Sequence, residues 1–454
     1  MNFSSKISRE YQTKLTSAEN AVQVVKSGDW IDYGAFGTSP ETLDAALAQR
    51  VDELQNVKIR ALAFPGKAKV AIADKGQDRL IYNNWHFSSG DRNNHDNGNC
   101  YYIPLVYNEG PSHYEGTLRT DVCMVRTTPM DAFGNFNFGV GNSFQRAIIE
   151  NAKTIIVEIN ETLPQCLGGT GESLHISEVD YIVESDNKPI LTIGAPPITE
   201  IDKKIADHIV SEIRDGACIQ LGIGGLPNAV LDSIASSGIK NCGLHTEMLT
   251  SKMVDLIEHG VVTNSEKVKD RFKTVFTFCL GDRELYDYAD HNSAFAMYPV
   301  DYTNHPFIIA QQPRMFSLNS AINVDLTGQV ASEQMVFNGK PYQISGSGGQ
   351  LDFVMGTMMS QDQKGISVLS LYSTYKGISR ILPLLETGSN ITVPRTLTQY
   401  VATEWGVVNL RGLSNSQRAL ALISIAHPDF REDLSRKAYE MGLVSYRQRQ
   451  GRND

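Results

Sequence analysis

Long hydrophobic runs are missing from this sequence of 454 residues. No stretch reaches the roughly 18 consecutive apolar residues that a membrane-spanning helix needs, so we expect no membrane segment. The N-terminal run MNFSSKISREYQTKL also lacks the apolar centre of a signal peptide. With 41% hydrophobic and 20% charged residues, the composition is typical of a soluble globular protein, which we expect in the cytoplasm.

Paired cysteines and dense positive charge are missing as well. The six cysteines form no C-x-x-C pair and stand mostly in apolar runs, which favours reduced core residues over disulfides or metal ligands. The net charge is −10, and the only basic cluster is a short C-terminal tail, so nucleic acid is not an expected partner. We expect no metal, because the candidate ligands are isolated histidines, namely His86, His95 and His113.

A repeated pattern indicates how the chain is divided. Residues 29–43 and 217–231 follow one plan, a short strand, a Gly-x-x-Gly turn, a proline and a helix, about 188 residues apart. The length and this repeat predict an α/β fold of two similar doubly wound domains related by internal duplication. The proline-rich run PILTIGAPP at 189–197 predicts a linker, which gives domains 1–190 and 198–454.

Hydrophobic periodicity predicts alternating strands and helices along both halves. A helix over 16–27 would begin at Thr16 as N-cap, with Glu19 as its capping-box partner. The run at 87–98, FSSGDRNNHDNG, is polar enough to predict a loop. Further helices are expected over 142–153 and 415–426, and strands over 58–64, 121–127, 154–158, 274–280, 307–310 and 367–371.

The second copy of the glycine turn, Gly222 to Pro227, lies between a predicted strand and a predicted helix. Such a turn directs backbone N–H groups and a helix N-terminus at one spot, which suits a phosphate, a carboxylate or a developing oxyanion. Pro227 stands where a dinucleotide fingerprint requires a third glycine, which argues against NAD or FAD. The alternative is a turn that only connects the strand to the helix.

The tripeptide His245-Thr246-Glu247 follows a second strand-like run that ends at Leu244. A glutamate just past such a strand would face the crevice where open α/β sheets bind ligands. The alternative is an ordinary capping or surface pair. The H-x-E lacks the downstream P-C-x-x-C that a zinc deaminase requires.

Several longer segments together resemble the family I coenzyme A transferases, and in particular their acetyl-CoA hydrolase/transferase branch. The matching segments cover most of residues 120–431 and include DVCMVRTTPMDAFGNFNFGVG, HISEVDYIVE, GIGGLPNAVLDSI, LHTEMLTSKMVDLIEHGVVTN, AMYPVDYTNHP, NSAINVDLTGQVASE, QISGSGGQLDFVMG, KGISRILPLL and IAHPDF. The chain departs from the family pattern at 338–342, which reads as a short insertion, and at 108–111, which bears on acyl selectivity.

The resemblance implies a role for each matching residue. Glu247 corresponds to the catalytic glutamate, and Asn304 to a polar group near that carboxylate. Gly349 corresponds to a backbone donor to the oxyanion, so we expect the Gly346–Gly349 loop to face the same cleft as Glu247. The expected contacts with coenzyme A (CoA) are Gly222, Ile223, Gly224, Gly225, Leu226, Ile322, Gly346 and Lys376.

The resemblance also implies a ping-pong reaction. CoA would pass from an acyl-CoA to a small carboxylic acid, such as acetate, butyrate, 4-hydroxybutyrate or succinate, through a glutamyl-CoA thioester on Glu247. CoA would then be a substrate, no cofactor would be bound permanently, and the protein would be a homodimer or higher homo-oligomer. Two alternatives stay open: an acyl-CoA hydrolase, if water reaches the thioester, and a non-catalytic ligand sensor of related fold.

Overall fold

A computed structural model describes residues 5–449, which fall into two compact units. The first unit comprises the chain up to Gly194 together with Glu247–Ser251 and Lys273–Asn304. The second comprises Ala195–Thr246, Lys252–Phe272 and the chain from His305 onward. Residues 185–199 contain no helix or strand, as expected of the predicted linker. The division into domains 1–190 and 198–454 stays a prediction.

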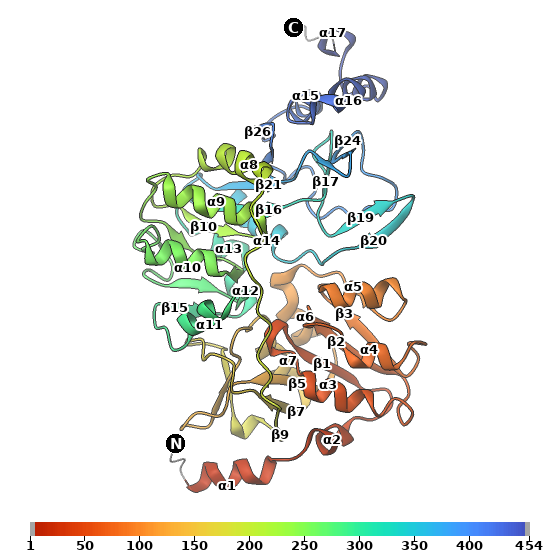
Figure 1. The fold of residues 1–454 in the computed structure, drawn as a ribbon, viewed down its shortest axis with the longest axis vertical. Coiled ribbons are helices and arrows are strands. Elements are labelled where there is room, and N and C mark those ends of the chain that lie inside the picture. Colours follow the sequence, from red (N-terminus) through yellow and green to blue (C-terminus); the bar gives the residue numbers. More distant parts are fainter. Residues whose placement is uncertain (1–4, 450–454) are drawn as a thin grey trace. The chain divides into compact units, whose positions relative to one another are not determined.

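The first unit is built on a seven-stranded sheet whose neighbouring strands are all parallel, in the order β4-β3-β2-β1-β5-β7-β9 (Figure 1). Sequence order reverses beside β1, which has β2 on one side and β5 on the other. The strands are β1 (Trp30–Ala35), β2 (Val57–Leu62), β3 (Leu80–Asn84), β4 (Tyr101–Tyr102), β5 (Thr120–Thr127), β7 (Ala152–Ile159) and β9 (Tyr181–Glu184).

Apolar side chains of this sheet enter two core clusters. On β5, Val122 and Met124 belong to one cluster, and Cys123 and Val125 to the other, so both faces of the strand are covered. The helices of the unit are α1 (Ser5–Lys14), α2 (Ala18–Ala21), α3 (Glu41–Ala48), α4 (Lys69–Ala73), α5 (Ser89–Asp96), α6 (Gly110–Gly116), α7 (Gln145–Asn151), α11 (Arg283–Ala289) and α12 (Val300–Thr303). Single 3₁₀ turns are η1 (Val22–Val24), η2 (Phe36–Thr38), η3 (Tyr107–Glu109) and η4 (Ile176–Glu178).

Short strand pairs complete the first unit. An antiparallel pair joins β6 (Asn135–Asn137) and β8 (Ser173–His175). Two parallel pairs are formed by the inserted segments: β12 (Met248–Leu249) with β14 (Phe278–Cys279), and β13 (Thr274–Phe276) with β15 (Phe295–Met297). The predicted strand over 274–280 is therefore two strands that belong to different pairs.

The second unit contains a six-stranded sheet in the order β11-β10-β16-β21-β25-β26, parallel except for β26 at one edge (Figure 1). Here sequence order reverses beside β10, which lies between β11 and β16. The strands are β10 (Cys218–Leu221), β11 (Gly243–Leu244), β16 (Phe316–Ser320), β21 (Ile366–Ser370), β25 (Tyr400–Thr403) and β26 (Gly406–Asn409).

The second unit also contains helices, a three-stranded sheet in the order β18-β17-β24, and the strand pairs β19–β20 and β22–β23. The helices are α8 (Glu200–Val210), α9 (Gly225–Ser236), α10 (Ser251–Glu258), α13 (Pro306–Ile309), α14 (Gln350–Met358), α15 (Asn415–Ser424), α16 (Pro428–Glu440) and α17 (Tyr446–Arg449). The remaining strands are β17 (Asn323–Asp325), β18 (Val330–Ala331), β19 (Gln334–Phe337), β20 (Lys340–Gln343), β22 (Thr374–Tyr375), β23 (Ile378–Ser379) and β24 (Ile381–Leu382). Within residues 5–449, every helix is too short or too polar to cross a membrane.

Three local predictions are wrong. Residues 307–310 lie in and just after helix α13 and not in a strand, because Pro306 begins a helix and the His305 ring accepts a hydrogen bond from Phe307 N. The polar run at 87–98 contains helix α5, which begins with a capping box between Ser88 and Asp91. The helix expected from Thr16 is the short α2 followed by a 3₁₀ turn, and its N-cap is Ser17.

The segment that departs from the family pattern forms a hairpin. Strands β19 and β20 pair antiparallel and are joined by Asn338 and Gly339, whose φ angles are 51° and 74°. Two consecutive positive φ angles are the signature of the tight turn that Asn-Gly favours. The extra residues therefore extend a hairpin and leave the main sheet of the unit intact.

Candidate active site

Glu247 is held at the start of strand β12 in the first unit. Its carbonyl oxygen accepts hydrogen bonds from Thr277 N at 3.0 Å and Phe278 N at 3.3 Å. Met248 and Leu249, the next two residues, are buried and pair with β14. The Glu247 side chain is partly exposed. A fixed backbone with an accessible carboxylate is the arrangement that a nucleophile requires.

The segment that receives Glu247 is itself braced by a loop of the first unit. The carbonyl oxygen of Thr277 accepts from Asn142 N at 2.9 Å, and its hydroxyl accepts from Ser143 N at 3.1 Å. Cys279 N donates to Val140 O at 2.9 Å. All these groups are buried, so each bond satisfies a polar group that has lost water. The loop therefore fixes the backbone beneath the Glu247 carboxylate.

Asn304 contacts the Glu247 carboxylate directly. Its Nδ2 lies 2.7 Å from Glu247 Oε2 and donates a hydrogen bond to it. Asn304 is fully buried and ends helix α12, where its own N–H bonds Val300 O at 2.8 Å. Val300 N in turn donates to Ser143 O at 2.8 Å, on the loop that braces Thr277. The structure thus brings together Glu247 and Asn304, whose proposed roles stay predictions.

Phe36 is a residue of this region that the sequence did not single out. It stands at the end of β1 with a φ of 51°, a backbone conformation that costs an aromatic residue about 1–2 kcal/mol. Its ring stacks on Phe278 with centroids 3.8 Å apart and planes 14° apart. Phe278 N bonds Glu247 O, so the strained turn packs beside the glutamate's backbone support. A positive φ at phenylalanine has no sequence signal.

The glycine turn of the second unit has the predicted strand-turn-helix form. Gly222 follows β10 and donates to Leu318 O at 3.0 Å, and Gly224, with φ 137°, stands just before α9. A side chain at Gly225 would meet Asp202 Oδ2 and Pro197 O, both 3.0 Å from its Cβ, so only glycine fits easily. Ile223 is 45% exposed at the tip of the turn, whereas Leu226 is buried. The first N–H groups of α9 are available to an anion here.

The third glycine loop lies at the same edge of the second sheet. Gly346 and Gly349 belong to the segment that leads into helix α14, where Gly349 is the N-cap. Gln350 donates through Nε2 to Ser320 O at 3.0 Å, which places the start of the helix beside the end of β16. Ile322 lies two residues after Ser320, the last residue of β16, and its N–H donates to Ala331 O at 2.8 Å. The expected approach of this loop to Glu247 stays a prediction.

Lys376 lies at the tip of the hairpin β22–β23, which follows β21. It is exposed, and its ammonium lies 5.4 Å from the Tyr375 ring centroid. The Arg380 guanidinium lies over the same ring, 5.1 Å from its centroid. Burial lowers the pKa of Arg380. Among residues 5–449, no carboxylate lies within 4 Å of it. The sequence did not single out Arg380, whose signal was only a cation four residues after Lys376. Of the predicted CoA contacts of the second unit, Gly222 to Leu226, Ile322 and Lys376 follow the carboxyl ends of β10, β16 and β21, and Gly346 follows β20.

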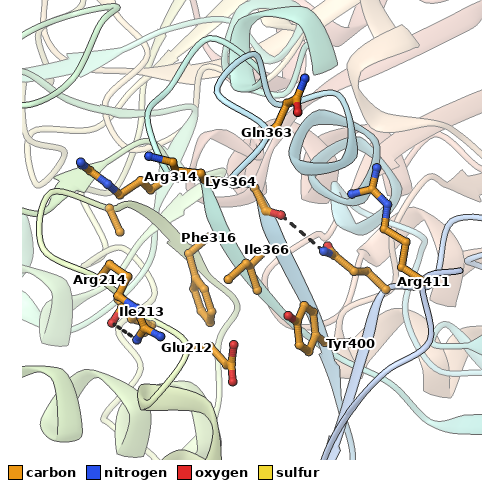
Figure 2. A pocket seen from close by; sticks show the side chains of 13 residues that line it. Glu212, Ile213, Arg214, Arg314, Phe316, Gln363, Lys364, Ile366, Tyr400 and Arg411 are labelled. Atoms are coloured by element: carbon orange, nitrogen blue, oxygen red, sulfur yellow. Dashed lines mark hydrogen bonds between the residues drawn. The ribbon is translucent and has the colours of Figure 1, made fainter.

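A separate pocket opens at the opposite, amino edge of the second sheet (Figure 2). It has a volume of about 480 Å³, and Phe316, Ile366 and Tyr400, at the starts of β16, β21 and β25, line it. The remaining lining residues are Glu212, Ile213, Arg214, Ala217, Arg314, Gln363, Lys364, Gly365, Gln399 and Arg411. Because none of the predicted site residues lines this pocket, it is distinct from the candidate active site.

The first unit therefore holds a carboxylate oriented by an amide, and the second holds glycine turns and cations at the carboxyl edge of a parallel sheet. In open α/β sheets this edge is where ligands bind, next to the strand where the order reverses. A carboxylate held by an amide, as in the first unit, is suited to covalent acyl transfer, because it is ionised at neutral pH and needs no base. The fold and site thus define an α/β acyl-transfer protein.

Comparison with known proteins identifies the family. Residues 2–194 match the N-terminal domain of the acetyl-CoA hydrolase/transferases, and residues 281–438 match their C-terminal domain. A butyryl-CoA:acetate CoA-transferase of Anaerostipes caccae is 44% identical over 94% of this chain and 96% of its own length. The chain belongs to the acetyl-CoA hydrolase/transferase family.

Two further relatives agree with this assignment. A 4-hydroxybutyrate coenzyme A transferase of Clostridium kluyveri is 36% identical over 93% of this chain and 97% of its own length. The crystal structure of RipA from Yersinia pestis superposes with a TM-score of 0.87 at 34% identity, covering 96% of this chain and all of that one. The family resemblance inferred from the sequence is confirmed.

Proposed function

We propose that this protein is a CoA-transferase that moves CoA between an acyl-CoA and a small carboxylic acid, with Glu247 as the nucleophile. The observation that carries the proposal is the 2.7 Å hydrogen bond from Asn304 Nδ2 to Glu247 Oε2 on a braced backbone. An amide donor at this distance holds the carboxylate in one orientation, which is what covalent catalysis needs. The names of the relatives support transfer, with acetate, butyrate, 4-hydroxybutyrate and succinate as candidate acids.

The reaction would run in two half-steps on Glu247. The carboxylate attacks the thioester carbonyl carbon, the C–S bond breaks, and CoA leaves as the thiolate while an acyl-glutamyl anhydride forms. The thiolate then attacks the glutamyl carbonyl carbon, which releases the first carboxylate and leaves a glutamyl-CoA thioester. The incoming acid reverses both steps. Each tetrahedral intermediate needs N–H donors, at about 3–4 kcal/mol for each donor, and we assign one of these to Gly349.

The CoA arm would be held by the second unit. We assign Gly222, Ile223, Gly224, Gly225 and Leu226 to the part of CoA near the thioester, since the turn combines exposed N–H groups with an apolar tip. Lys376 and Arg380 supply positive charge for its phosphates. Ile322 and Gly346 are assigned to the same arm, because they follow the neighbouring strand end. No permanently bound cofactor enters this scheme.

We also propose that the two units are doubly wound and arose by duplication. The support is that the repeated turns at Gly34–Pro40 and Gly222–Pro227 each follow the strand beside which the sheet order reverses, β1 and β10. Superposition of the two sheets should place these turns at equivalent positions. The division into domains 1–190 and 198–454, the homo-oligomeric state and the cytoplasmic location stay predictions.

The test of the nucleophile is to trap it. Incubation with acyl-CoA in the absence of an acceptor should leave CoA covalently attached, detectable by intact-protein mass and mapped to Glu247 after borohydride treatment. Glu247→Ala should form no adduct and lose transfer. Glu247→Asp should lose about a hundredfold, because the carboxylate moves by about 1 Å. A matched control is Glu212→Ala, which removes a carboxylate from the pocket at the other edge of the second sheet and should transfer normally.

The alternatives give different results in the same experiment. A hydrolase would release free CoA steadily without an acceptor acid, whereas a transferase requires one. A ligand sensor would form no adduct, and its affinity for acyl-CoA would be the same in wild type and Glu247→Ala. An adduct mapped to another side chain, or full turnover by Glu247→Ala, would defeat the assignment of the nucleophile.

A further inference from the structure

Lys267 is a buried lysine that the proposed reaction does not use. It is 3% exposed, and its Nζ donates to Leu244 O at 2.9 Å. Asn264, from the same loop of the second unit, accepts through Oδ1 a hydrogen bond from Leu244 N at 2.8 Å. The two side chains therefore hold one peptide unit from both sides, and we call this pair the Leu244 clamp.

The position of Leu244 explains why the clamp is needed. Strand β11 is the last strand of its sheet. Two backbone N–H groups on either side of Leu244 bond the neighbouring strand region: Gly243 N donates to Ala217 O at 2.9 Å, and His245 N donates to Ile219 O at 3.3 Å. The N–H and C=O of Leu244 therefore point to the other side, away from β10. In a wider sheet, a further strand on that side would bond them. The clamp replaces that strand, because a buried peptide without partners would cost several kcal/mol.

The aliphatic stem of Lys267 packs tightly in the clamp. A Cβ added at Gly243 would lie 2.6 Å from Lys267 Cγ and 3.1 Å from Lys267 Cδ, so the lysine stem lies directly against the glycine backbone. His245, the next residue after Leu244, is fully buried, and its Nδ1 lies 3.3 Å from Gln312 Nε2. The strand end is thus fixed by contacts at two successive residues.

Glu247 is the third residue after Leu244 in the chain. We propose that the Leu244 clamp, through the Lys267 ammonium and the Asn264 amide oxygen, sets the position from which the chain delivers Glu247 for acyl transfer. Lys267 is a positioning residue: it acts through the Leu244 peptide and the two residues between it and the nucleophile. The inference rests on the proposed role of Glu247.

The test uses Lys267→Met, which keeps the aliphatic stem and removes the donor. We expect the rate of glutamyl-CoA formation and kcat to fall about tenfold to a hundredfold, because displacements near 1 Å at the nucleophile have this effect. The KM for acyl-CoA and the affinity for CoA should change less than about twofold, since the CoA-binding turns are untouched. Lys364→Met, an exposed lysine of the pocket in Figure 2, is the matched control and should behave as wild type.

A double-mutant cycle tests the geometry independently. Gly243→Ala should impair adduct formation by pushing the lysine stem away from Leu244 O. In a Lys267→Ala background the same change should have no further effect, because the stem it displaces is gone. Additive losses in the double variant would overturn the clamp, and so would an unchanged adduct rate in Lys267→Met. The clamp would also be overturned if Lys267→Met lost CoA binding in the same proportion as it lost folded protein.

Glu247→Ala is measured in the same experiment, so that a wrong nucleophile assignment and a wrong clamp assignment give different results. Transfer that survives in Glu247→Ala defeats the proposed nucleophile and with it the inference. An inactive Glu247→Ala combined with a normal adduct rate in Lys267→Met defeats the clamp alone.

Discussion

The buried Lys267 should leave a pH signature on stability, which a denaturation experiment can measure. Burial lowers the pKa of Lys267 from 10.5 to about 8, against the opposing effects of Cys218 and Asp270. The Cys218 thiol, whose own pKa burial raises to about 12, stays protonated in the folded protein across this range. The perturbation is Lys267→Met, which removes the titrating group and keeps the stem.

The sign follows from where the proton is lost. Between pH 8 and 10.5 the folded protein releases the lysine proton while the unfolded chain keeps it, so the free energy of unfolding of the wild type rises with pH. Below pH 8 both states carry the charge and the full cost of burying it is present. At about 1.4 kcal/mol for each pH unit, this cost is on the order of 3 kcal/mol and is gone above pH 10.5.

The assay is urea denaturation of wild type and Lys267→Met at pH 7.5, 8.5 and 9.5. Other groups that titrate in this range contribute equally to both proteins, so they cancel in the difference between the two free energies of unfolding. We expect this difference to shift in favour of wild type by about 1 kcal/mol or more between pH 8.5 and 9.5. Parallel pH profiles for the two proteins would show that Lys267 titrates normally and would refute the reasoning.

Two further predictions concern the site itself. Asn304→Ala removes the donor 2.7 Å from the Glu247 carboxylate. It should lower kcat/KM by about 10- to 150-fold, since a hydrogen bond to a charged group contributes about 1.5–3 kcal/mol. An unchanged kcat/KM in steady-state kinetics would contradict this prediction. Gly225→Ala places a Cβ 3.0 Å from Asp202 Oδ2 and Pro197 O and should cost about 1–3 kcal/mol of stability and raise the KM for acyl-CoA. Gly116→Ala, whose Cβ would meet nothing within 4 Å, is its control and should leave both unchanged or improve stability.

The sequence predicted the long, strongly apolar elements well. The run DVCMVRT lies within strand β5, all of whose residues are buried, because seven apolar or pairable residues in succession have no other stable environment than a parallel sheet. The turn at Gly222 was predictable because its glycines meet a backbone requirement that other residues meet poorly, such as the φ of 137° at Gly224.

Local patterns failed where capping decided the structure. Helix α5 is polar on every side and has no apolar period, so only the capping pair Ser88 and Asp91 indicated it. The four residues from Phe307 are a short apolar run, which periodicity alone cannot assign to a strand or a helix. In this case Pro306 decided for the helix.

The resemblance supplied candidate site residues, whose roles stay predictions, but it did not indicate the contacts that support them. Glu247 and Asn304 were identified by resemblance, whereas their contact joins residues 57 apart and depends on how the chain packs. Lys267 gave no signal, because a lysine in the polar run TNSEKVKDRF is normally a solvated surface residue. Its burial follows from its place at the outer edge of β11, where the 261–264 segment bonds Cys242 and the Lys267 side chain bonds Leu244. This place becomes evident only when the strand order is known.

The two copies of the glycine turn have the same sequence plan but different surroundings. In the first copy, neighbouring atoms leave no room for a side chain at either glycine of the turn. A Cβ at Gly34 would lie 2.2 Å from Thr38 O, and a Cβ at Gly37 would lie 2.4 Å from Val140 Cγ2. In the second copy a Cβ at Gly222 would meet nothing closer than Leu318 O at 3.8 Å, whereas a Cβ at Gly225, the counterpart of Gly37, would meet Asp202 Oδ2 and Pro197 O, both at 3.0 Å.

This difference assigns the two turns to different tasks. The first turn packs Phe36 on Phe278 and Gly37 on Val140. Phe278 N bonds Glu247 O, and Val140 O accepts from Cys279 N, the next residue along the same segment. The first turn therefore has the contacts of a structural support for the nucleophile's backbone. At the second turn the Gly222 position has room that the Gly34 position lacks, and the turn leads directly into the N-terminus of α9, which suits an anionic or thioester ligand. If the copies had kept equal roles, Gly34 and Gly222 would have similar surroundings; the Gly34 position is closed, and its turn lies against the segment that holds Glu247.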